Sequence, residues 1–410
     1  MTIVSTVKKI FDLFCGTGGF SSGLESASPD EFQTVLGVDI LKDSLQTFGA
    51  NHSKAKTLSQ DIRKISCKEI SQLTGVKQGD LSLIIGGPPC QGFSSLRPFR
   101  SSGHDDPRNS LFEQFANFVN YFRPTMFVLE NVVGLATHNN SETIQQIEEC
   151  FSSLGYSCDW RILNAAHYGV PQKRERLILI GAEQGVPISF PEHTHKCNGA
   201  TIGCRNRARL HLPDEPSLFN DFKDFPDAIT VNNAICDLPQ IESGEEVTEY
   251  DKAPLNEYQN ERRLNASHLS LHNSTKHTER MLEIIRHAGP NISCIPKHLI
   301  SSGFSSCYSR LTANEPSVTI TVNFVHPASN RCIHPKEDRA LTPREGARLQ
   351  SFDDNFIFSG TRSQIVKQIG NAVPPLLGRA IGYAIAKSLG IETQKPQRSL
   401  IATTDSRVPA

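Results

Sequence analysis

No stretch of this 410-residue sequence approaches the roughly 18 consecutive apolar residues that a membrane-spanning helix needs. The amino terminus does not have the form of a secretory signal, because the apolar pair Ile10-Phe11 runs directly into Asp12 and a glycine-containing segment. Hydrophobic residues make up 38% and charged residues 21% of the chain, a balance that excludes wholesale disorder. We therefore expect a globular cytoplasmic protein, with room for about two or three domains.

The cysteines contain no Cys-x-x-Cys pair, and their number, eleven, is odd. Neither a disulfide framework nor a zinc ribbon fits this scattered distribution. One local cluster has residue types that bind metals, namely His193, His195, Cys197 and Cys204, but its spacing matches no standard zinc pattern. We interpret the cluster as a polar loop and expect no metal site.

The chain has no large excess of charge of either sign, since its formal net charge is −1. A nucleic-acid-binding face requires only a local positive stripe, which a sum over the chain can hide. Three basic groups are present: Lys173, Arg174 and Arg176; Lys196, Arg205, Arg207 and Arg209; and Arg262, Arg263, Arg280 and Arg286. A charge run is more often a solvated face, so composition alone leaves nucleic-acid binding open.

Residues 1–187 alternate short apolar runs with amphipathic segments, which predicts an α/β fold with a doubly wound, mainly parallel sheet. The expected strands are Lys9–Phe14, Thr34–Asp39, Leu81–Ile85, Met126–Glu130, Ser157–Leu163 and Leu177–Gly181, with another ending near Leu58. The expected helices are Gly19–Ser26, Leu41–Ala50, Ser110–Tyr121 and Ser141–Leu154.

Beyond Pro187 the sequence becomes polar and weakly periodic, which indicates a second domain or a long irregular insertion. A regular pattern returns at Thr342-Pro343-Arg344-Glu345, which has the form of a helix start with a capping box. A second helix is expected over Leu376–Leu389, and the Ser/Thr/Pro/Arg-rich tail from Thr393 is expected to be loose.

A cysteine follows one of the apolar strands on a turn rich in glycine and proline, Gly86-Gly87-Pro88-Pro89-Cys90-Gln91-Gly92-Phe93-Ser94. Prolines fix φ, and glycines allow another molecule to approach the backbone closely. A buried structural cysteine needs no such turn, so this one is interpreted as a nucleophile.

A glycine turn after the first strand, within Phe11–Phe20, indicates a ligand site at the carboxyl edge of the sheet. Asp39 ends the next strand, where such folds place an acidic side chain on ribose hydroxyls. The third glycine of the dinucleotide fingerprint is absent, which favours an adenosine ligand without pyrophosphate over NAD. The pair Asp61-Ile62 follows at the same edge. Leu111, on a helix close after the Cys90 turn, could reach the pocket or simply pack in the core.

Glu130 sits where an apolar strand ends, a costly place for a carboxylate unless it is paired or used. Arg174 and Arg176 fall on one side of an extended segment by its period of two, and they require anionic or carbonyl partners. Gly370-Asn371-Ala372-Val373-Pro374-Pro375 is interpreted as a second glycine/proline turn, directly before a helix.

Taken in order, these motifs resemble those of the DNA cytosine-5 methyltransferase family, of the bacterial restriction-modification type. The resemblance covers residues 1–185 and 339–389. Its motifs are Phe11–Phe20, Gly87–Gln91, Glu130–Val132, Gln172–Arg176, Arg339–Glu345 with Ala347–Phe352, and Gln368–Pro375. The family's fold is a Rossmann-like domain that binds S-adenosylmethionine, with a smaller irregular target-recognition domain. The implied division is a catalytic domain at 1–187 completed by 366–392, a target-recognition domain at 188–365 and a loose tail at 393–410.

The resemblance implies a reaction in which the Cys90 thiolate adds to carbon 6 of cytosine and carbon 5 then attacks the methyl of S-adenosylmethionine. Arg174 is the candidate for lowering the pKa of the thiol. Glu130 holds ring nitrogen 3 and the exocyclic amine, and Arg176 binds the carbonyl oxygen at carbon 2. The base must be flipped out of the duplex, and Gln91 and Ser94 are expected to contact the opened strand.

The resemblance also implies a set of cofactor-binding residues: Phe14, Gly16, Gly19, Asp39, Ile40, Asp61, Ile62, Leu111 and Asn371. Asp39 stands where the family often has Glu, and Ile40 where some relatives have an aromatic residue. The expected partner is double-stranded DNA in the nucleoid. The protein is expected to be a monomer, with any cognate restriction endonuclease acting on the same site but not bound as a stable subunit.

Three other functions remain open at this stage. An RNA (tRNA) cytosine-5 methyltransferase would use the same fold and chemistry. An NAD-dependent dehydrogenase would use the glycine turn and Asp39 but leave Cys90 and Glu130 unexplained. A catalytically inactive DNA-binding module would be expected to carry degraded motifs, and none is degraded.

Overall fold

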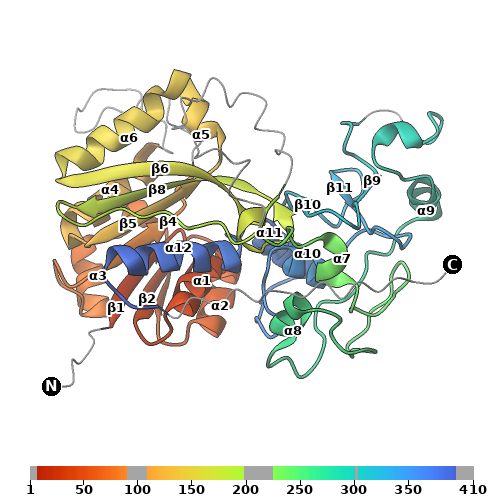
Figure 1. Cartoon of the computed structure of the whole chain (residues 1–410), viewed down its shortest axis with the longest axis horizontal. Helices are drawn as coiled ribbons and strands as arrows, with labels where there is room; N and C mark the ends of the chain where they lie inside the picture. The colour runs from red at the N-terminus through yellow and green to blue at the C-terminus, as the bar shows by residue number, and fades with distance from the viewer. Residues whose placement is uncertain (1–6, 90–108, 198–224, 301–302, 394–410) are drawn as a thin grey trace.

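The computed structural model describes residues 7–89, 109–197, 225–300 and 303–393 (Figure 1). The predicted residues Cys90, Gln91 and Ser94 therefore lie outside the described residues, as does Cys204. No helix within the described ranges is long and apolar enough to cross a lipid bilayer.

A seven-stranded sheet forms the centre of the larger lobe, with the strand order β3-β2-β1-β4-β5-β8-β6. Its strands are β1 (Lys8–Leu13), β2 (Phe32–Asp39), β3 (Lys56–Ser59), β4 (Leu83–Gly86), β5 (Met126–Asn131), β6 (Tyr156–Asn164) and β8 (Glu175–Glu183). β1 to β5 are parallel, and β8 runs antiparallel to both β5 and β6. The predicted α/β doubly wound fold is confirmed, and the chain order reverses on either side of β1 and β4.

Helices cover both faces of the sheet because its strands are apolar on both sides. Ile84 packs on one face with α4 (Asn109–Phe122) and α6 (Glu142–Ser153), whereas Leu83 and Ile85 join the opposite core cluster. On that opposite face, α1 (Gly19–Ala27) packs against α12 (Pro375–Ser388), which comes from the far end of the sequence (Figure 1). The remaining helices of this lobe are α2 (Lys42–Asn51), α3 (Cys67–Thr74) and the short α5 (Gly134–Thr137).

The segment after Pro187 contains little regular structure, as its weak periodicity predicts. It forms much of the smaller lobe in Figure 1. Its elements are α7 (Val231–Ile235), α8 (Glu257–Arg263), α9 (Glu279–Arg286), β9 (Ser309–Arg310), β10 (Ser317–Val318) and β11 (Arg331–Ile333). β10 pairs with β7 (Gln172–Lys173) of the larger lobe. Val231 and Phe324 belong to the same core cluster as Leu24 of α1, so the core is continuous between the lobes.

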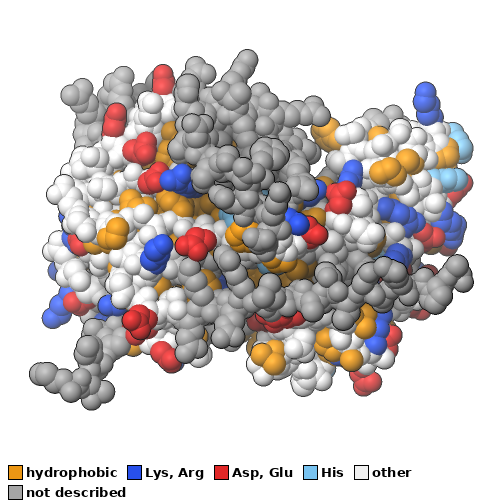
Figure 2. Space-filling view, viewed as in Figure 1, with side chains coloured by type: hydrophobic (Ala, Val, Ile, Leu, Met, Phe, Trp, Pro, Cys, Tyr) orange, Lys and Arg blue, Asp and Glu red, His pale blue; other side chains and the backbone are white. Residues whose placement is uncertain are grey.

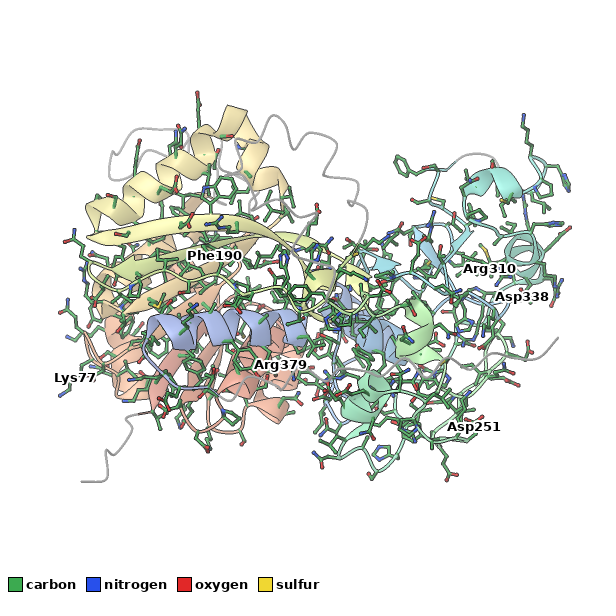
Figure 3. All side chains as sticks on the ribbon, viewed as in Figure 1. Lys77, Phe190, Asp251, Arg310, Asp338 and Arg379 are labelled. Atoms are coloured by element: carbon green, nitrogen blue, oxygen red, sulfur yellow. The ribbon has the colours of Figure 1, made fainter. Side chains whose placement is uncertain are left out.

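Arg310 connects several segments of the smaller lobe, which contains few helices and strands. Its guanidinium forms an ion pair with Asp338 and donates hydrogen bonds to the carbonyls of Ile285 and His334. Figure 3 shows Arg310 and Asp338 side by side in this lobe. Figure 2 shows acidic and basic side chains interspersed over the coloured residues of one face, in keeping with the small net charge.

The predicted capping box at Thr342 is confirmed: its hydroxyl accepts from the N–H of Glu345, and the helix α10 (Pro343–Leu349) follows. α10 is buried along its whole length, and its charges are paired. The Glu345 carboxylate receives Arg339 at 2.9 and 2.7 Å. Arg348 reaches Asp354 at 2.5 Å and Asp237 at 3.2 Å, with all three side chains 0% exposed.

We expect replacement of Arg348 by methionine to lower the free energy of unfolding by about 3–5 kcal/mol, because two buried carboxylates would lose their common partner. Urea unfolding measures the effect. The matched control is Lys173→Met, which removes the more exposed ion pair with Glu315 and should cost less than about 1 kcal/mol. Equal losses in the two variants would contradict this account.

The structure corrects one prediction and contains helices that the sequence did not predict. Gly370 and Asn371 belong to α11 (Arg362–Asn371), so the predicted turn is confined to the residues after Asn371. A side chain at Gly370 would meet the backbone of Thr321 at 2.5 Å, so this glycine permits a close helix contact. Two of the helices that were not predicted, α3 and α11, begin at capping boxes, Ser66 with Glu69 and Thr361 with Gln364.

Candidate active site

A cavity of about 780 Å³ lies at the carboxyl ends of β1, β2, β4 and β5. Parallel strands place their following residues at one edge, so this is where an open α/β sheet binds its ligands. All the predicted cofactor residues line the cavity: Phe14, Gly16, Gly19, Asp39, Ile40, Asp61, Ile62, Leu111 and Asn371. Several other residues also line the cavity although no sequence motif marks them as cofactor residues; they include Asp12, Thr17, Asp43, Gln364 and Lys367.

The glycine turn between β1 and α1 forms one wall of the cavity. Phe14, Gly16 and Gly18 have φ values of 65°, 51° and 85°, and this left-handed conformation explains the glycines of the motif. Asp39 stabilises the turn, because its carboxylate accepts the N–H of Gly16 at 2.9 Å and that of Leu41 at 2.8 Å. Burial raises the pKa of Asp39, and these backbone N–H groups act in the opposite direction.

The far wall and the mouth of the cavity combine a paired acid with apolar surface. Asp61 binds the Arg63 guanidinium at 2.9 and 3.0 Å, and this contact lowers the pKa of its carboxyl. Ile62 beside it is 4% exposed, whereas Ile40 is 65% exposed at the cavity edge. A large apolar side chain open to a cavity offers surface that a flat ligand can cover.

Glu130 and Arg176 form an ion pair at the other end of the cavity. The Nε of Arg176 lies 2.8 Å from Oε1 of Glu130, and both side chains are about 15% exposed (14% and 15%). They meet because β8 runs antiparallel to β5, so the start of β8 lies beside the carboxyl end of β5. The carboxylate at this strand end is thus paired, which lowers the cost of placing it there.

The beginning of the proposed nucleophile loop is anchored against this ion pair. A Cβ at Gly87 would lie 3.0 Å from Oε2 of Glu130, so the backbone passes directly beside the carboxylate. The Nδ2 of Asn131 donates to the carbonyl of Pro88 at 2.9 Å. Gly87 and Pro89 line the cavity together with Glu130. Cys90, the next residue, lies outside the described residues.

Arg174 is turned into the protein, 2% exposed, at the junction of β7 and β8. It donates to the carbonyls of Ile320 at 3.1 Å and Gly370 at 3.2 Å, so its predicted need for carbonyl partners is met. Its Nε has no partner among the described residues. Burial lowers its pKa well below the ordinary value, with a smaller effect from Arg176. Its predicted effect on the Cys90 thiol stays a prediction.

The His193–Cys197 segment packs on the larger lobe. The rings of His193 and His167 stack at 4.5 Å, and burial lowers the pKa of His193 to about 4. Within the described part of the chain no three His, Cys, Asp or Glu side chains are arranged to hold a metal ion. The structure thus offers a packing role for His193.

Asp12 lines the cavity but is 2% exposed, and burial raises its pKa from 3.8 to about 7 despite a hydrogen bond from Ser21. The folded state therefore keeps a proton that the unfolded state has released, and stability should fall as pH rises from about 4 to about 7. We expect the free energy of unfolding of Asp12→Asn to rise relative to that of wild type as pH increases across that window, by at most about 1.4 kcal/mol per pH unit. Urea unfolding over this pH range measures the difference. The exposed Asp30→Asn is the control and should show no such trend.

The chain matches known proteins over nearly its whole length. A sequence model of the family described as C-5 cytosine-specific DNA methylase matches residues 8–387. The Type II methyltransferase M.AgeI of Thalassovita gelatinovora is 32% identical, with 92% of this chain and 99% of that protein covered. M1.HphI of Haemophilus parahaemolyticus, also a Type II methyltransferase, is 35% identical, with 92% and 86% covered.

Solved structures show the same fold. A putative DNA modification methyltransferase encoded within an E. coli prophage has a TM-score of 0.69 at 24% identity, with 93% of this chain and 99% of that chain covered. The S. pombe Dnmt2 methyltransferase has a TM-score of 0.56 at 16% identity, with 94% and 99% covered. The family match and the sequence relatives, taken with the site geometry, show that the chain belongs to the C-5 cytosine-specific DNA methylase family and is a DNA cytosine-5 methyltransferase.

Proposed function

We propose that the protein transfers a methyl group from S-adenosylmethionine to carbon 5 of a cytosine flipped out of a short duplex DNA sequence, through a covalent adduct with Cys90. The observation that carries this proposal is a single cavity that reaches from Asp39 and Asp61 to the Glu130–Arg176 pair. A donor bound at one end of such a cavity and a base held at the other would place the methyl group between them.

The residues of the cavity fit the proposed donor. A volume of about 780 Å³ suits a small-molecule ligand. No atom lies within 4 Å of the position that a Cβ would take on Gly16, so a ligand can approach the backbone there. Ile40 would cover an adenine face, while Asp39 and Asp61 supply acceptors for hydroxyl and amine groups. When bound, S-adenosylmethionine would supply an electrophilic methyl group.

The chain's own residues would activate the base. The Cys90 sulfur would form a bond to carbon 6, and the electron pair at carbon 5 would form the new carbon–methyl bond as the methyl–sulfur bond of the donor breaks and S-adenosylhomocysteine leaves. Glu130 would hold ring nitrogen 3 and the exocyclic amine, and Arg176 the oxygen at carbon 2, so that charge building on the ring meets positioned donors. Loss of the proton at carbon 5 would return electrons to the ring and expel the thiolate. Arg174 would assist by raising the local positive potential.

The two lobes would have different roles in the reaction, as the sequence predicts. Residues 1–187 with 366–392 would form the catalytic domain, supported by the packing of α12 on α1. The segment 188–365 would recognise the target, with its basic residues on phosphates and a few polar side chains on base edges. Gln91 and Ser94 would contact the opened strand.

The sequence relatives favour a bacterial modification role. M.AgeI and M1.HphI are both Type II methyltransferases by name. We propose that this enzyme protects a specific site from a cognate endonuclease that is not a stable subunit. It would act as a monomer on the DNA of the cytoplasmic nucleoid.

Transfer of labelled methyl groups to duplex DNA, with tRNA as a competing substrate, tests the proposal. We expect labelling of duplex DNA, with bisulfite sequencing placing the product at one cytosine of a short motif. Preferential labelling of tRNA would instead identify the RNA-modifying alternative. Binding of a nicotinamide cofactor, without binding of S-adenosylmethionine, would support the alternative of an NAD-dependent dehydrogenase. Binding of DNA without any methyl transfer would support the alternative of an inactive DNA-binding module.

A further inference from the structure

His52 is buried directly behind the glycine turn of the cavity, although it does not line the cavity itself. It follows the last turn of α2, is 5% exposed and contacts Phe48, with ring centroids 4.5 Å apart and ring planes tilted by 30°. Its Nδ1 lies 3.0 Å from Oε2 of Glu25 on α1. Its Nε2 lies 3.2 Å from both the carbonyl of Gly18 and the hydroxyl of Ser22.

These partners define the proton positions on the ring. The Glu25 carboxylate is ionised at neutral pH, because contacts with His52 and the N–H of Thr34 outweigh burial and lower its pKa. A carboxylate and a backbone carbonyl can only accept hydrogen bonds, so Nδ1 donates to Glu25, and a hydrogen bond to Gly18 requires that Nε2 donates. His52 thus links α1 to the glycine turn, with the Ser22 hydroxyl as a further partner of Nε2.

The imidazole also determines the shape of the turn. Gly18 has a φ of +85°, and a Cβ on it would lie 2.6 Å from Nε2 of His52 and 2.8 Å from Phe48. The neighbouring Thr17 lines the cavity and is 2% exposed, and its hydroxyl has no hydrogen-bond partner among the described residues. The ring thus fixes the inner side of a turn whose outer side lines the cavity.

We infer that His52 is a positioning residue for the methyl donor: by donating to the Gly18 carbonyl, it preorganises the glycine turn that contacts the donor. The inference rests on the proposed binding of S-adenosylmethionine in this cavity. Without the contact to His52, the glycine turn must become ordered when the donor binds. This cost weakens the affinity for the donor without changing the affinity for DNA.

The test compares His52→Phe and His52→Gln with wild type. Phenylalanine is larger but keeps an aromatic ring against Phe48 and removes both ring nitrogens, whereas the side-chain amide of glutamine can donate to the Gly18 carbonyl. Calorimetry with S-adenosylhomocysteine should show a Kd about tenfold higher for His52→Phe and a smaller increase for His52→Gln. The KM for S-adenosylmethionine should rise in parallel, with kcat and the Kd for duplex DNA near wild type.

His272 provides the matched control, since it is also buried and its Nε2 lies 2.8 Å from the Pro239 carbonyl in the other lobe. His272→Phe should lower the melting temperature without raising the Kd for S-adenosylhomocysteine. A folded His52→Phe protein with a wild-type Kd would overturn the inference, and so would equal weakening of donor and DNA binding. If His52→Phe does not fold, the other two variants decide. The inference is overturned if both His52→Gln and Glu25→Gln bind S-adenosylhomocysteine with a wild-type Kd. Failure of wild type to bind S-adenosylhomocysteine would instead refute the proposed function.

Discussion

Replacement of Cys90 by serine is expected to abolish methyl transfer, with a loss of at least about 10³-fold in kcat. A hydroxyl is far less ionised than a thiol at neutral pH and is a weaker nucleophile, so carbon 5 would not be activated. Filter-bound transfer of labelled methyl groups to duplex DNA measures the rate. The Kd for S-adenosylhomocysteine should stay near the wild-type value, because Cys90 is not among the proposed donor contacts.

A duplex containing 5-fluorodeoxycytidine gives an independent measurement of the same step. The fluorine cannot leave as a proton does, so wild type should be trapped as a covalent adduct that Cys90→Ser does not form. Cys67→Ser is the matched control: Cys67 is half-buried on α3, away from the cavity lining, and the variant should be trapped like wild type. Rapid transfer by Cys90→Ser would refute the covalent mechanism.

Replacement of Glu130 by glutamine is expected to lower kcat by about 10²–10⁴-fold. Glutamine has nearly the same shape, but it cannot exchange a proton with ring nitrogen 3. It also removes the charge that holds Nε of Arg176 at 2.8 Å. The pair therefore loses both its acid and the orientation of its arginine, and single-turnover transfer at saturating donor should show the loss.

Glu315→Gln is the control for this change, because Glu315 is also ion-paired, with Lys173 at 3.1 Å, but is 56% exposed. We expect it to retain wild-type kcat. The melting temperature of Glu130→Gln separates lost chemistry from lost folding, since only the first predicts a stable, inactive protein. A Glu130→Gln enzyme with wild-type kcat would remove Glu130 from the mechanism.

Most of the larger lobe could be predicted because its signals are local. Apolar runs of the right length define strands, and the residues that end them share one edge of a parallel sheet. For this reason Asp39, Asp61 and Glu130 meet around one cavity although they are far apart in sequence. The ends of helices are harder to predict from local signals. A glycine can be required by a close contact as well as by a turn, and α11 therefore continues through Gly370.

The sequence by itself determined the fold class, the family and the residues at the carboxyl edge, because each depends on local periodicity or on contiguous motifs. Only the tertiary structure decided that Arg174 turns inward to two backbone carbonyls, that Arg348 joins two buried carboxylates, and that His52 lies behind Gly18. These contacts join segments separated by up to about two hundred residues, as Arg174 and Gly370 are by 196. Their geometry depends on how helices and strands pack, and no local pattern encodes it.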